Sequence, residues 1–158
     1  MSKTIYIDMD NVLADYKSAY LQAIEKCPDM KYPQSQYGFF LDLNPIEGGI
    51  EGVKSISNLG YTVYFASAPS FRNPMCLAEK NMWIRKYFGD DWTKKLILIY
   101  KKNLLKGDYL IDDDVKNGQT EFEGCHIHFG TISPIFGDLR AWDKIVNLFN
   151  GLSKRDFA

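Results

Sequence analysis

Short runs of β-branched and aromatic residues alternate along the chain with segments whose apolar positions recur every three or four residues. The runs predict β-strands, because such residues suit a pleated, buried surface, and the recurring spacing predicts amphipathic helices. The predicted strands are residues 4–7, 61–67, 95–100, 109–111 and 125–130, and the predicted helices are residues 16–27, 50–59, 74–87 and 139–149.

Helix-breaking residues mark the ends of these predicted helices. The residues predicted to stop them are Pro28, Gly60, Gly89 and the pair Asn150-Gly151. Asn73 is the predicted N-cap of the third helix, and Pro74 is its first helical residue. Trp83 and Trp142 fall on apolar helix faces, so we interpret both as core residues.

Strands that alternate with helices predict an α/β fold of three layers, with a parallel sheet covered on both faces. Residues 16–49 fit this alternation poorly, because they contain Pro28, Pro33, Pro45 and the aromatic stretch QYGFFLDL. We interpret them as a small helical cap inserted after the first strand. The core domain then comprises residues 1–15 and 50–158.

Composition restricts the partners and the compartment. At 158 residues with a formal net charge of −1, the chain is most simply one domain without a global field for polymeric nucleic acid or an anionic membrane. Its three cysteines are widely spaced and lack a CxxC pair, which fits a reducing cytoplasm. We see no signal peptide and no apolar run of about 20 residues, and therefore expect a cytoplasmic protein.

Acidic residues follow two of the predicted strands. Asp8 and Asp10 come at the end of the first strand, and Asp112 to Asp114 follow the run YLI. Ligands of parallel sheets bind beyond the carboxyl ends of the strands, where these carboxylates would repel one another unless a cation were present. A hard divalent ion, most plausibly Mg2+, accepts such ligands. The competing interpretation is a turn at Asp10 and a solvated loop at Asp112 to Asp114.

Ser67 and Lys102 also fall at or just after strand ends. A hydroxyl and an ammonium there could donate to the oxygens of a transferring phosphoryl group. One carboxylate could attack phosphorus to form an aspartyl-phosphate, and a second could protonate the leaving oxygen. His126 and His128 alternate on a predicted strand without a third ligand nearby in sequence, so we interpret them as buried or edge residues.

The segment DMDNVLAD resembles the DxDx(V/T) motif of the haloacid dehalogenase (HAD) superfamily. Ser67 resembles its second-motif hydroxyl residue, Lys102 its lysine, and LIDDD its terminal acidic pair. The resemblance extends to the 5'(3')-deoxyribonucleotidases, in which DMDGVLADF is followed by a GFFLDLEPIPGA-like stretch and by LIDD after the lysine. The corresponding segments here are DMDNVLADY, GFFLDLNPIEGG and LIDDD, and AEKNMWIRKYFG is similar to the family's EKYxWVExxxG.

This resemblance implies a HAD-like, Rossmann-like fold and a set of roles around one Mg2+ ion. It implies that Asp8 is the nucleophile and a metal ligand. Asp10 would be the general acid and then base, and its backbone carbonyl would bind the metal. Asp113 would complete the protein ligands, with Asp112 beside it in support.

The resemblance also implies the residues that hold the substrate. Those expected at the phosphate are Ser67, Lys102 and Met9, and those expected along the rest of the substrate are Tyr16, Phe40 and Ala68. Tyr16 would stack on the base, and Phe40 would form a second aromatic wall.

Three residues depart from the family pattern. Asn11 replaces the usual Gly, so a positive φ there has to be tolerated by Asn. Ala68 stands where the family often has Ser, which removes one hydroxyl from the phosphate site. Tyr100 stands where animal members have Arg, which leaves the selectivity between 5' and 3' phosphates open.

The function implied is Mg2+-dependent hydrolysis of deoxyribonucleoside monophosphates, with dTMP and dUMP as the expected substrates. The partner would be a small nucleotide, and a homodimer is compatible with the sequence. One alternative is a HAD phosphatase for another small phosphomonoester, such as a phosphosugar. Another is a non-catalytic phosphoacceptor or nucleotide-binding module, although receiver domains carry the acidic pair first and the lysine last.

Overall fold

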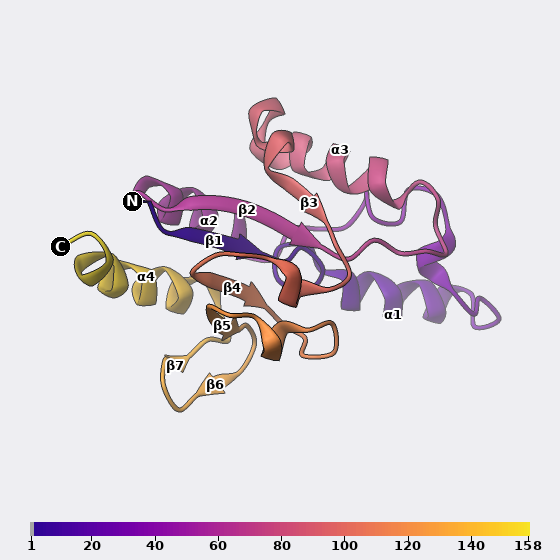
Figure 1. Cartoon of the computed structure of the whole chain (residues 1–158). Helices are drawn as coiled ribbons and strands as arrows, with labels where there is room; N and C mark the ends of the chain where they lie inside the picture. The colour runs from indigo at the N-terminus through magenta and orange to yellow at the C-terminus, as the bar shows by residue number, and fades with distance from the viewer. Residues whose placement is uncertain (1) are drawn as a thin grey trace.

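Five parallel strands form the central sheet in the computed structural model, which describes residues 2–158 (Figure 1). Their order across the sheet is β3-β2-β1-β4-β5, and every neighbouring pair is parallel. The strands are β1 (Thr4–Ile7), β2 (Thr62–Ser67), β3 (Leu96–Leu98), β4 (Tyr109–Asp112) and β5 (Cys125–His128). A separate antiparallel hairpin consists of β6 (Ile132–Ser133) and β7 (Gly137–Asp138).

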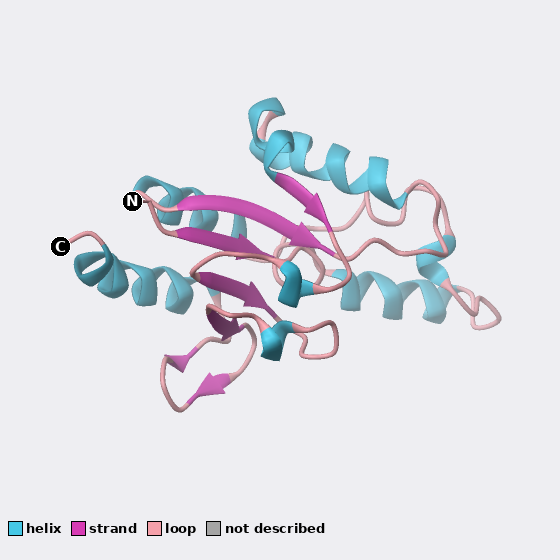
Figure 2. Cartoon of the chain, viewed as in Figure 1, coloured by secondary structure: helices cyan, strands magenta, loops and turns pink. Residues whose placement is uncertain are grey.

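Four α-helices accompany the sheet, as Figure 2 shows. They are α1 (Tyr16–Lys26), α2 (Gly49–Asn58), α3 (Cys76–Phe88) and α4 (Trp142–Asp156). Four short 3-10 turns complete the regular structure, namely η1 (Pro33–Ser35), η2 (Asp90–Lys95), η3 (Lys102–Leu104) and η4 (Gln119–Glu121). The predicted α/β architecture with a parallel sheet is thereby confirmed.

The alternation of side chains along β1 explains how the sheet is covered. Ile5 and Ile7 point to one face, where they belong to the main core together with side chains of α2, α3 and α4. Tyr6 points to the other face and packs in a smaller cluster with Leu105 and Phe122, which border η3 and η4. The larger core therefore lies under the helices, and short turns cover the second face.

The segment predicted as a cap begins and ends at one place. Ala14 and Pro45 form an antiparallel bridge, and the backbone N–H of Ile46 donates to Leu13 O at 2.7 Å. Between these points the chain forms α1 and η1, which lie beyond the arrowheads of β1 and β2 in Figure 1. This placement sets the segment over the carboxyl edge of the sheet. The division into a core domain and a cap stays a prediction.

Three helix boundaries were predicted wrongly. The last helix does not stop at Asn150-Gly151 but continues to Asp156, because Leu152 is only 4% exposed and extends the apolar stripe across the glycine. It also begins at Trp142, since Leu139 pairs with Thr131 in the hairpin extension. The helix α3 begins at Cys76 rather than Pro74.

The prediction that Asn73 is the N-cap of α3 was wrong, because Met75 takes that position and Asn73 lies in the turn before the helix. Its side-chain Oδ1 accepts a hydrogen bond from Met75 N at 2.9 Å, so the asparagine closes a turn one step before the helix. Trp83 and Trp142 are both buried, as predicted, and each indole N–H donates to a backbone carbonyl, Leu43 O and Val12 O respectively. None of the helices within residues 2–158 combines the length and the apolarity that crossing a membrane requires.

Candidate active site

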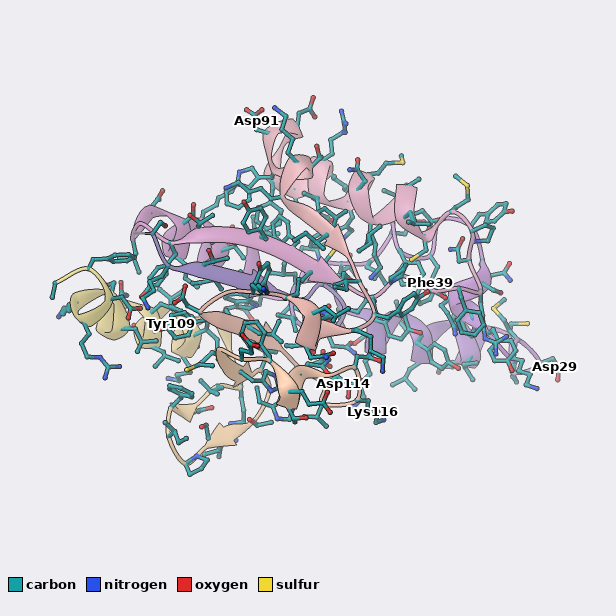
Figure 3. The ribbon with its side chains drawn as sticks, viewed as in Figure 1. Asp29, Phe39, Asp91, Tyr109, Asp114 and Lys116 are labelled. Carbon is teal, nitrogen blue, oxygen red and sulfur yellow. The ribbon has the colours of Figure 1, made fainter. Side chains whose placement is uncertain are left out.

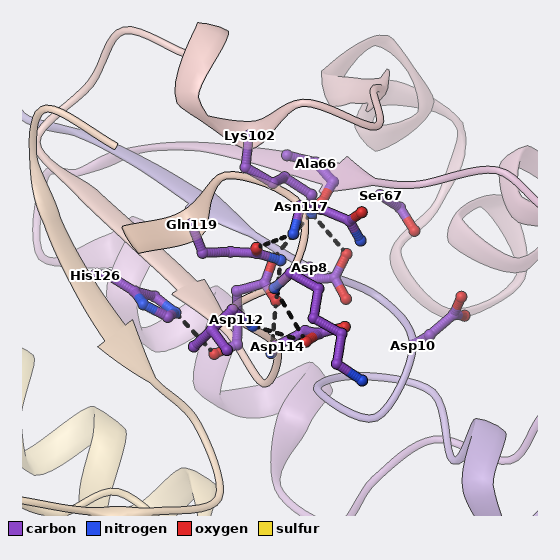
Figure 4. Close-up of polar contacts among 12 residues, drawn as sticks. Asp8, Asp10, Ala66, Ser67, Lys102, Asp112, Asp114, Asn117, Gln119 and His126 are labelled. Atoms are coloured by element: carbon purple, nitrogen blue, oxygen red, sulfur yellow. Dashed lines mark hydrogen bonds and ion pairs between the residues drawn. The ribbon is translucent and has the colours of Figure 1, made fainter. Parts of the chain in front are cut away.

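The carboxyl ends of the central strands open into one cavity of about 170 Å³. Asp8 follows β1, Ser67 ends β2, and Asp112 ends β4, so parallel strands bring three distant segments to one edge (Figure 4). The cavity is lined by Asp8, Asp10, Asn11, Tyr16, Ala68, Lys102, Asp112, Asp113, Asp114, Asn117 and Gln119.

The loop after β1 turns sharply around one carbonyl. Met9 O accepts hydrogen bonds from the backbone N–H groups of Val12, Leu13 and Ala14, at 3.2, 2.8 and 2.9 Å. Asn11 adopts the positive φ of 60° that its replacement of glycine required. The backbone N–H groups of Met9 and Asp10 have no acceptor among residues 2–158 and stand beside Asp8. Met9 is 1% exposed, so its side chain is not available to a ligand.

Lys102 is the buried cation at the centre of the site. Its Nζ donates to Asp8 Oδ1 at 2.9 Å and to Asp112 Oδ2 at 3.0 Å, and it also contacts Ala66 O (Figure 4). Burial by itself lowers the pKa of this ammonium, but Asp8 and Asp112 outweigh burial and raise its pKa above the ordinary value. Lys102 therefore remains charged and neutralises part of the acidic cluster.

Asp8, Asp112 and Asp113 each offer a carboxylate oxygen within 4.8 Å of the other two. Burial, followed by the charges of Asp8 and Asp112, raises the pKa of Asp113 to about 7. The carboxylate of Asp112 is fully engaged, because its Oδ1 also accepts from Gln119 Nε2 at 3.1 Å and from Asp114 N at 2.9 Å. One lysine for three carboxylates leaves excess negative charge, and a divalent cation fits such a donor set.

Asp10 lines the same cavity, but its carboxylate points away from the acidic cluster. Its Oδ2 accepts from Lys80 Nζ at 2.7 Å, and that ammonium also donates to Ser67 Oγ at 2.8 Å. Burial raises the pKa of Asp10, although the charge of Lys80 opposes this effect. With the side chain engaged in this way, the backbone carbonyl is the Asp10 group left for a metal ion, which is the contribution that the family resemblance implies.

Sequence reasoning missed Lys80 as a site residue. Lys80 is 1% exposed on α3 and lies in the apolar stripe of that helix, next to Trp83 and Ile84 in the pattern. A lysine within an apolar stripe indicates a buried partner, because an unpaired buried ammonium is strongly unfavourable. Gln119 was also missed, and it is also 1% exposed. Unlike Lys80, it has no feature in the surrounding sequence that could have revealed it.

Of the three residues predicted along the substrate, two line the cavity and the third is buried behind it. Tyr16 and Ala68 line the cavity, and burial together with Asp10 raises the pKa of Tyr16 to about 12. Phe40 is 2% exposed and does not line the cavity; its ring packs 6.1 Å from that of Tyr16. The role of Phe40 as a wall of the base site stays a prediction.

His126 and His128 on β5 contact the backbone carbonyls of the acidic residues that follow β4. The Nε2 atom of His126 lies 3.2 Å from Asp112 O, and that of His128 lies 3.0 Å from Asp113 O. Their rings stack with centroids 5.3 Å apart. Both imidazoles thus contact the backbone that carries Asp112 and Asp113, which is a structural contact on an edge strand.

Comparison with known proteins shows the family to which the chain belongs. Residues 29–149 match the profile of the family described as 5' nucleotidase, deoxy (pyrimidine), cytosolic type C. The chain belongs to this family. It is 37% identical to a putative 5'(3')-deoxyribonucleotidase of Vibrio phage KVP40, over 80% of this chain and 75% of that protein. It is 26% identical to the human cytosolic-type 5'(3')-deoxyribonucleotidase, over 98% of both chains.

A solved structure agrees with this family at the level of the fold. A haloacid dehalogenase-like hydrolase from Xanthomonas campestris superposes with a TM-score of 0.62, covering 98% of this chain and 94% of that one at 11% identity. The chain is therefore an enzyme, a HAD-type phosphatase of the 5'(3')-deoxyribonucleotidase family. Tyr100 is 47% exposed.

Proposed function

We propose that this enzyme hydrolyses deoxyribonucleoside monophosphates, with dTMP and dUMP as preferred substrates, through an aspartyl-phosphate on Asp8 and with Mg2+ as cofactor. The observation that carries the proposal is the position of Asp8. It lies in a shared cavity, between an ammonium that engages one of its oxygens and an acidic pair that completes a cation site. The preference for pyrimidines is supported by the family description.

The reaction follows from the two aspartates of the first loop. Lys102 binds Asp8 Oδ1 and leaves Oδ2 without a hydrogen bond among residues 2–158. An Asp8 oxygen forms a bond to phosphorus while the bond from phosphorus to the nucleoside oxygen breaks, and the Asp10 carboxyl gives its proton to that oxygen. Water then attacks phosphorus, Asp10 takes its proton, and the bond from phosphorus to Asp8 breaks, which restores both residues.

Other groups of the chain bind the phosphate and the cation. The Ser67 hydroxyl and the free backbone N–H groups of Met9 and Asp10 would donate to phosphate oxygens. The Lys102 ammonium would do so in place of one of its three present acceptors, Asp8, Asp112 and Ala66 O. Asp8, Asp113 and the Asp10 carbonyl would hold Mg2+, with Asp112 in support. When bound, Mg2+ neutralises charge on the phosphate and keeps the carboxylates ionised.

The size of the cavity bears on the substrate. Its volume of about 170 Å³ is smaller than the range of about 300–1,000 Å³ that is common for ligand pockets. It would hold the phosphoryl group, with the nucleoside extending past Tyr16 toward the cap. The same size, together with the buried position of Phe40, also favours a second candidate, a small phosphosugar.

The remaining expectations belong to the same proposal. The partner is a free nucleotide rather than polymeric nucleic acid or a membrane, the compartment is the cytoplasm, and a homodimer is compatible with the chain. Cell fractionation tests the compartment, and the molar mass of the protein in solution tests the homodimer.

The test of the function is phosphate release from a panel of 5' and 3' nucleotides and phosphosugars, with Mg2+ or with a chelator. Asp8→Asn should reduce turnover to background while the far-ultraviolet circular dichroism stays the same. Asp91→Asn is the matched control, because the Asp91 side chain is 94% exposed and lies well apart from Asp114 and the site in Figure 3. Unchanged activity of Asp8→Asn would refute the mechanism, and comparable turnover of a phosphosugar would favour the second candidate.

A further inference from the structure

The ammonium of Lys80 is enclosed by three groups from three parts of the chain. Its Nζ lies 2.7 Å from Asp10 Oδ2, 2.8 Å from Ser67 Oγ and 4.8 Å from the centroid of the Phe40 ring. Lys80 is 1% exposed and does not line the cavity. Its two hydrogen bonds and the aromatic face account for its donors, so it acts on a bound phosphate only through its neighbours.

The contact with Ser67 determines what that hydroxyl does. An ammonium can only donate, so Ser67 Oγ accepts from Lys80 and its own hydrogen is directed elsewhere. Ser67 is fully buried at the end of β2, beside the cavity residue Ala68. Ser67 does not itself line the cavity, so its hydroxyl hydrogen would reach a phosphate oxygen that approaches the end of β2 beside Ala68.

The contact with Asp10 has a similar effect on the carboxyl group. Lys80 engages Oδ2, whereas Oδ1 has no hydrogen-bond partner among residues 2–158. The Asp10 side chain is 25% exposed and lines the cavity. The oxygen that remains free is thus the one that can carry a proton to a leaving group.

Glu79, the residue before Lys80, binds the segment of Gly38 to Phe40, which covers Lys80 and is called the cover below. Glu79 is 4% exposed, and its carboxylate accepts from Gly38 N at 2.7 Å and from Phe40 N at 3.0 Å. Asn73 Nδ2 lies 3.3 Å from the same carboxylate. Adjacent residues of α3 therefore hold the Phe40 segment with one side chain and the two site residues with the other.

We propose that Lys80 is a positioning residue of the phosphatase reaction, which orients the Asp10 carboxyl and the Ser67 hydroxyl toward the phosphoryl group under a cover that Glu79 holds in place. This inference rests on the proposed function, because it assigns Lys80 to the proton-transfer step of that reaction. In that step the bond from phosphorus to the nucleoside oxygen breaks, and the Asp10 proton moves to that oxygen. Without Lys80, the Asp10 carboxyl loses the hydrogen bond that sets its rotamer.

Such a role predicts a dependence on the leaving group. A nucleoside leaves as an alkoxide that needs the proton, whereas p-nitrophenolate is stable without one. In Lys80→Met, which keeps the length but not the ammonium, kcat/KM for dTMP should fall by about 100-fold or more, the range expected for lost general acid catalysis. The value of kcat/KM for p-nitrophenyl phosphate should fall by less than about 10-fold. The quantity compared is kcat/KM because it reports the transfer of the phosphoryl group to Asp8, whereas kcat also contains the later hydrolysis of the aspartyl-phosphate, which is the same for both substrates. If dTMP is a poor substrate, the alkyl phosphate that the wild type hydrolyses fastest replaces it.

The ratio of the two rates is measured on one preparation, so it does not depend on the fraction of folded protein. Lys86→Met is the matched control, because Lys86 is exposed on the same helix, and its ratio should equal that of the wild type. Lys80→Arg keeps a charged donor. Its ratio of the rate on dTMP to the rate on p-nitrophenyl phosphate should therefore lie closer to the wild-type ratio than that of Lys80→Met.

Equal losses on both substrates would assign Lys80 a purely structural role and overturn the inference, as would unchanged rates. A Lys80→Arg ratio as low as that of Lys80→Met would also contradict it. A wild-type protein that hydrolyses neither substrate would instead refute the proposed function, so the two failures are distinguishable.

Discussion

Gly52 on α2 faces the side chain of Trp142, the first residue of α4. A Cβ atom at this position would lie 2.6 Å from Cε3 of Trp142 and 3.3 Å from its Cδ2. Trp142 is 1% exposed, and its indole N–H donates to Val12 O at 2.8 Å, so the ring cannot move without breaking that hydrogen bond. We therefore expect Gly52→Ala to destabilise the protein.

The magnitude follows from two opposing effects. Replacing glycine by alanine inside a helix stabilises it by about 1 kcal/mol. Overpacking a well-filled core costs about 1–3 kcal/mol, and the upper half of this range applies because the contact is below 3 Å and involves a fixed ring. The expected net change for Gly52→Ala is a loss of about 1–2 kcal/mol in the free energy of unfolding.

Gly151→Ala is the matched control. Gly151 lies inside α4, and a Cβ there would meet nothing within 4 Å, so only the helix propensity changes. We expect a gain of about 0.5–1 kcal/mol.

Urea and thermal unfolding of the two variants measure the difference. A separation of about 2 kcal/mol corresponds to roughly 4–8 °C in Tm for a chain of this size. Circular dichroism should show the wild-type helix content in both variants at low temperature. Changes of the same sign in the two variants would refute the packing argument.

Four further results are expected from other parts of the molecule. Asp113 must lose its proton to bind a cation, so Mg2+ affinity by calorimetry should weaken as the pH falls below about 7, and Asp113→Asn should remove this dependence. Because the pKa of Asp113 is raised in the folded state, the metal-free protein should lose stability as the pH rises from about 4 to 7; stability that increases over this interval would contradict the assignment. The hydroxyls of Tyr61 and Tyr109 both donate to Asp156 Oδ2 at 2.8 Å, so Asp156→Ala should lower the free energy of unfolding by about 1–3 kcal/mol; an unchanged urea midpoint would show that water replaces the carboxylate. Ala68→Ser would add a hydroxyl to the cavity wall and should lower KM by roughly 2–10-fold, the equivalent of one neutral hydrogen bond; a higher KM would place Ala68 away from the phosphate.

The sequence was sufficient for the architecture and for the residues that stand at strand ends. Asp8, Ser67 and Asp112 could be predicted together because each follows a β-prone run, and parallel strands share one carboxyl edge. The roles proposed for these residues came from a family resemblance, since a chain pattern locates a carboxylate but does not show its partner. The end of the last helix was predicted wrongly because Gly151 is a local signal, whereas burial of Leu152 is a property of the packed molecule.

The order of apolar and polar residues by itself determined the parallel sheet, its helices and the edge at which the acidic residues gather, because these depend on local periodicity and on strand direction. Only the tertiary structure decided which charges meet. Lys80 and Asp10 are 70 positions apart, and Lys102 and Asp8 are 94 apart. No periodicity relates residues at such separations. Their pairing arises when α3 and η3 pack against the sheet and bury both ammonium groups beside the carboxylates that neutralise them.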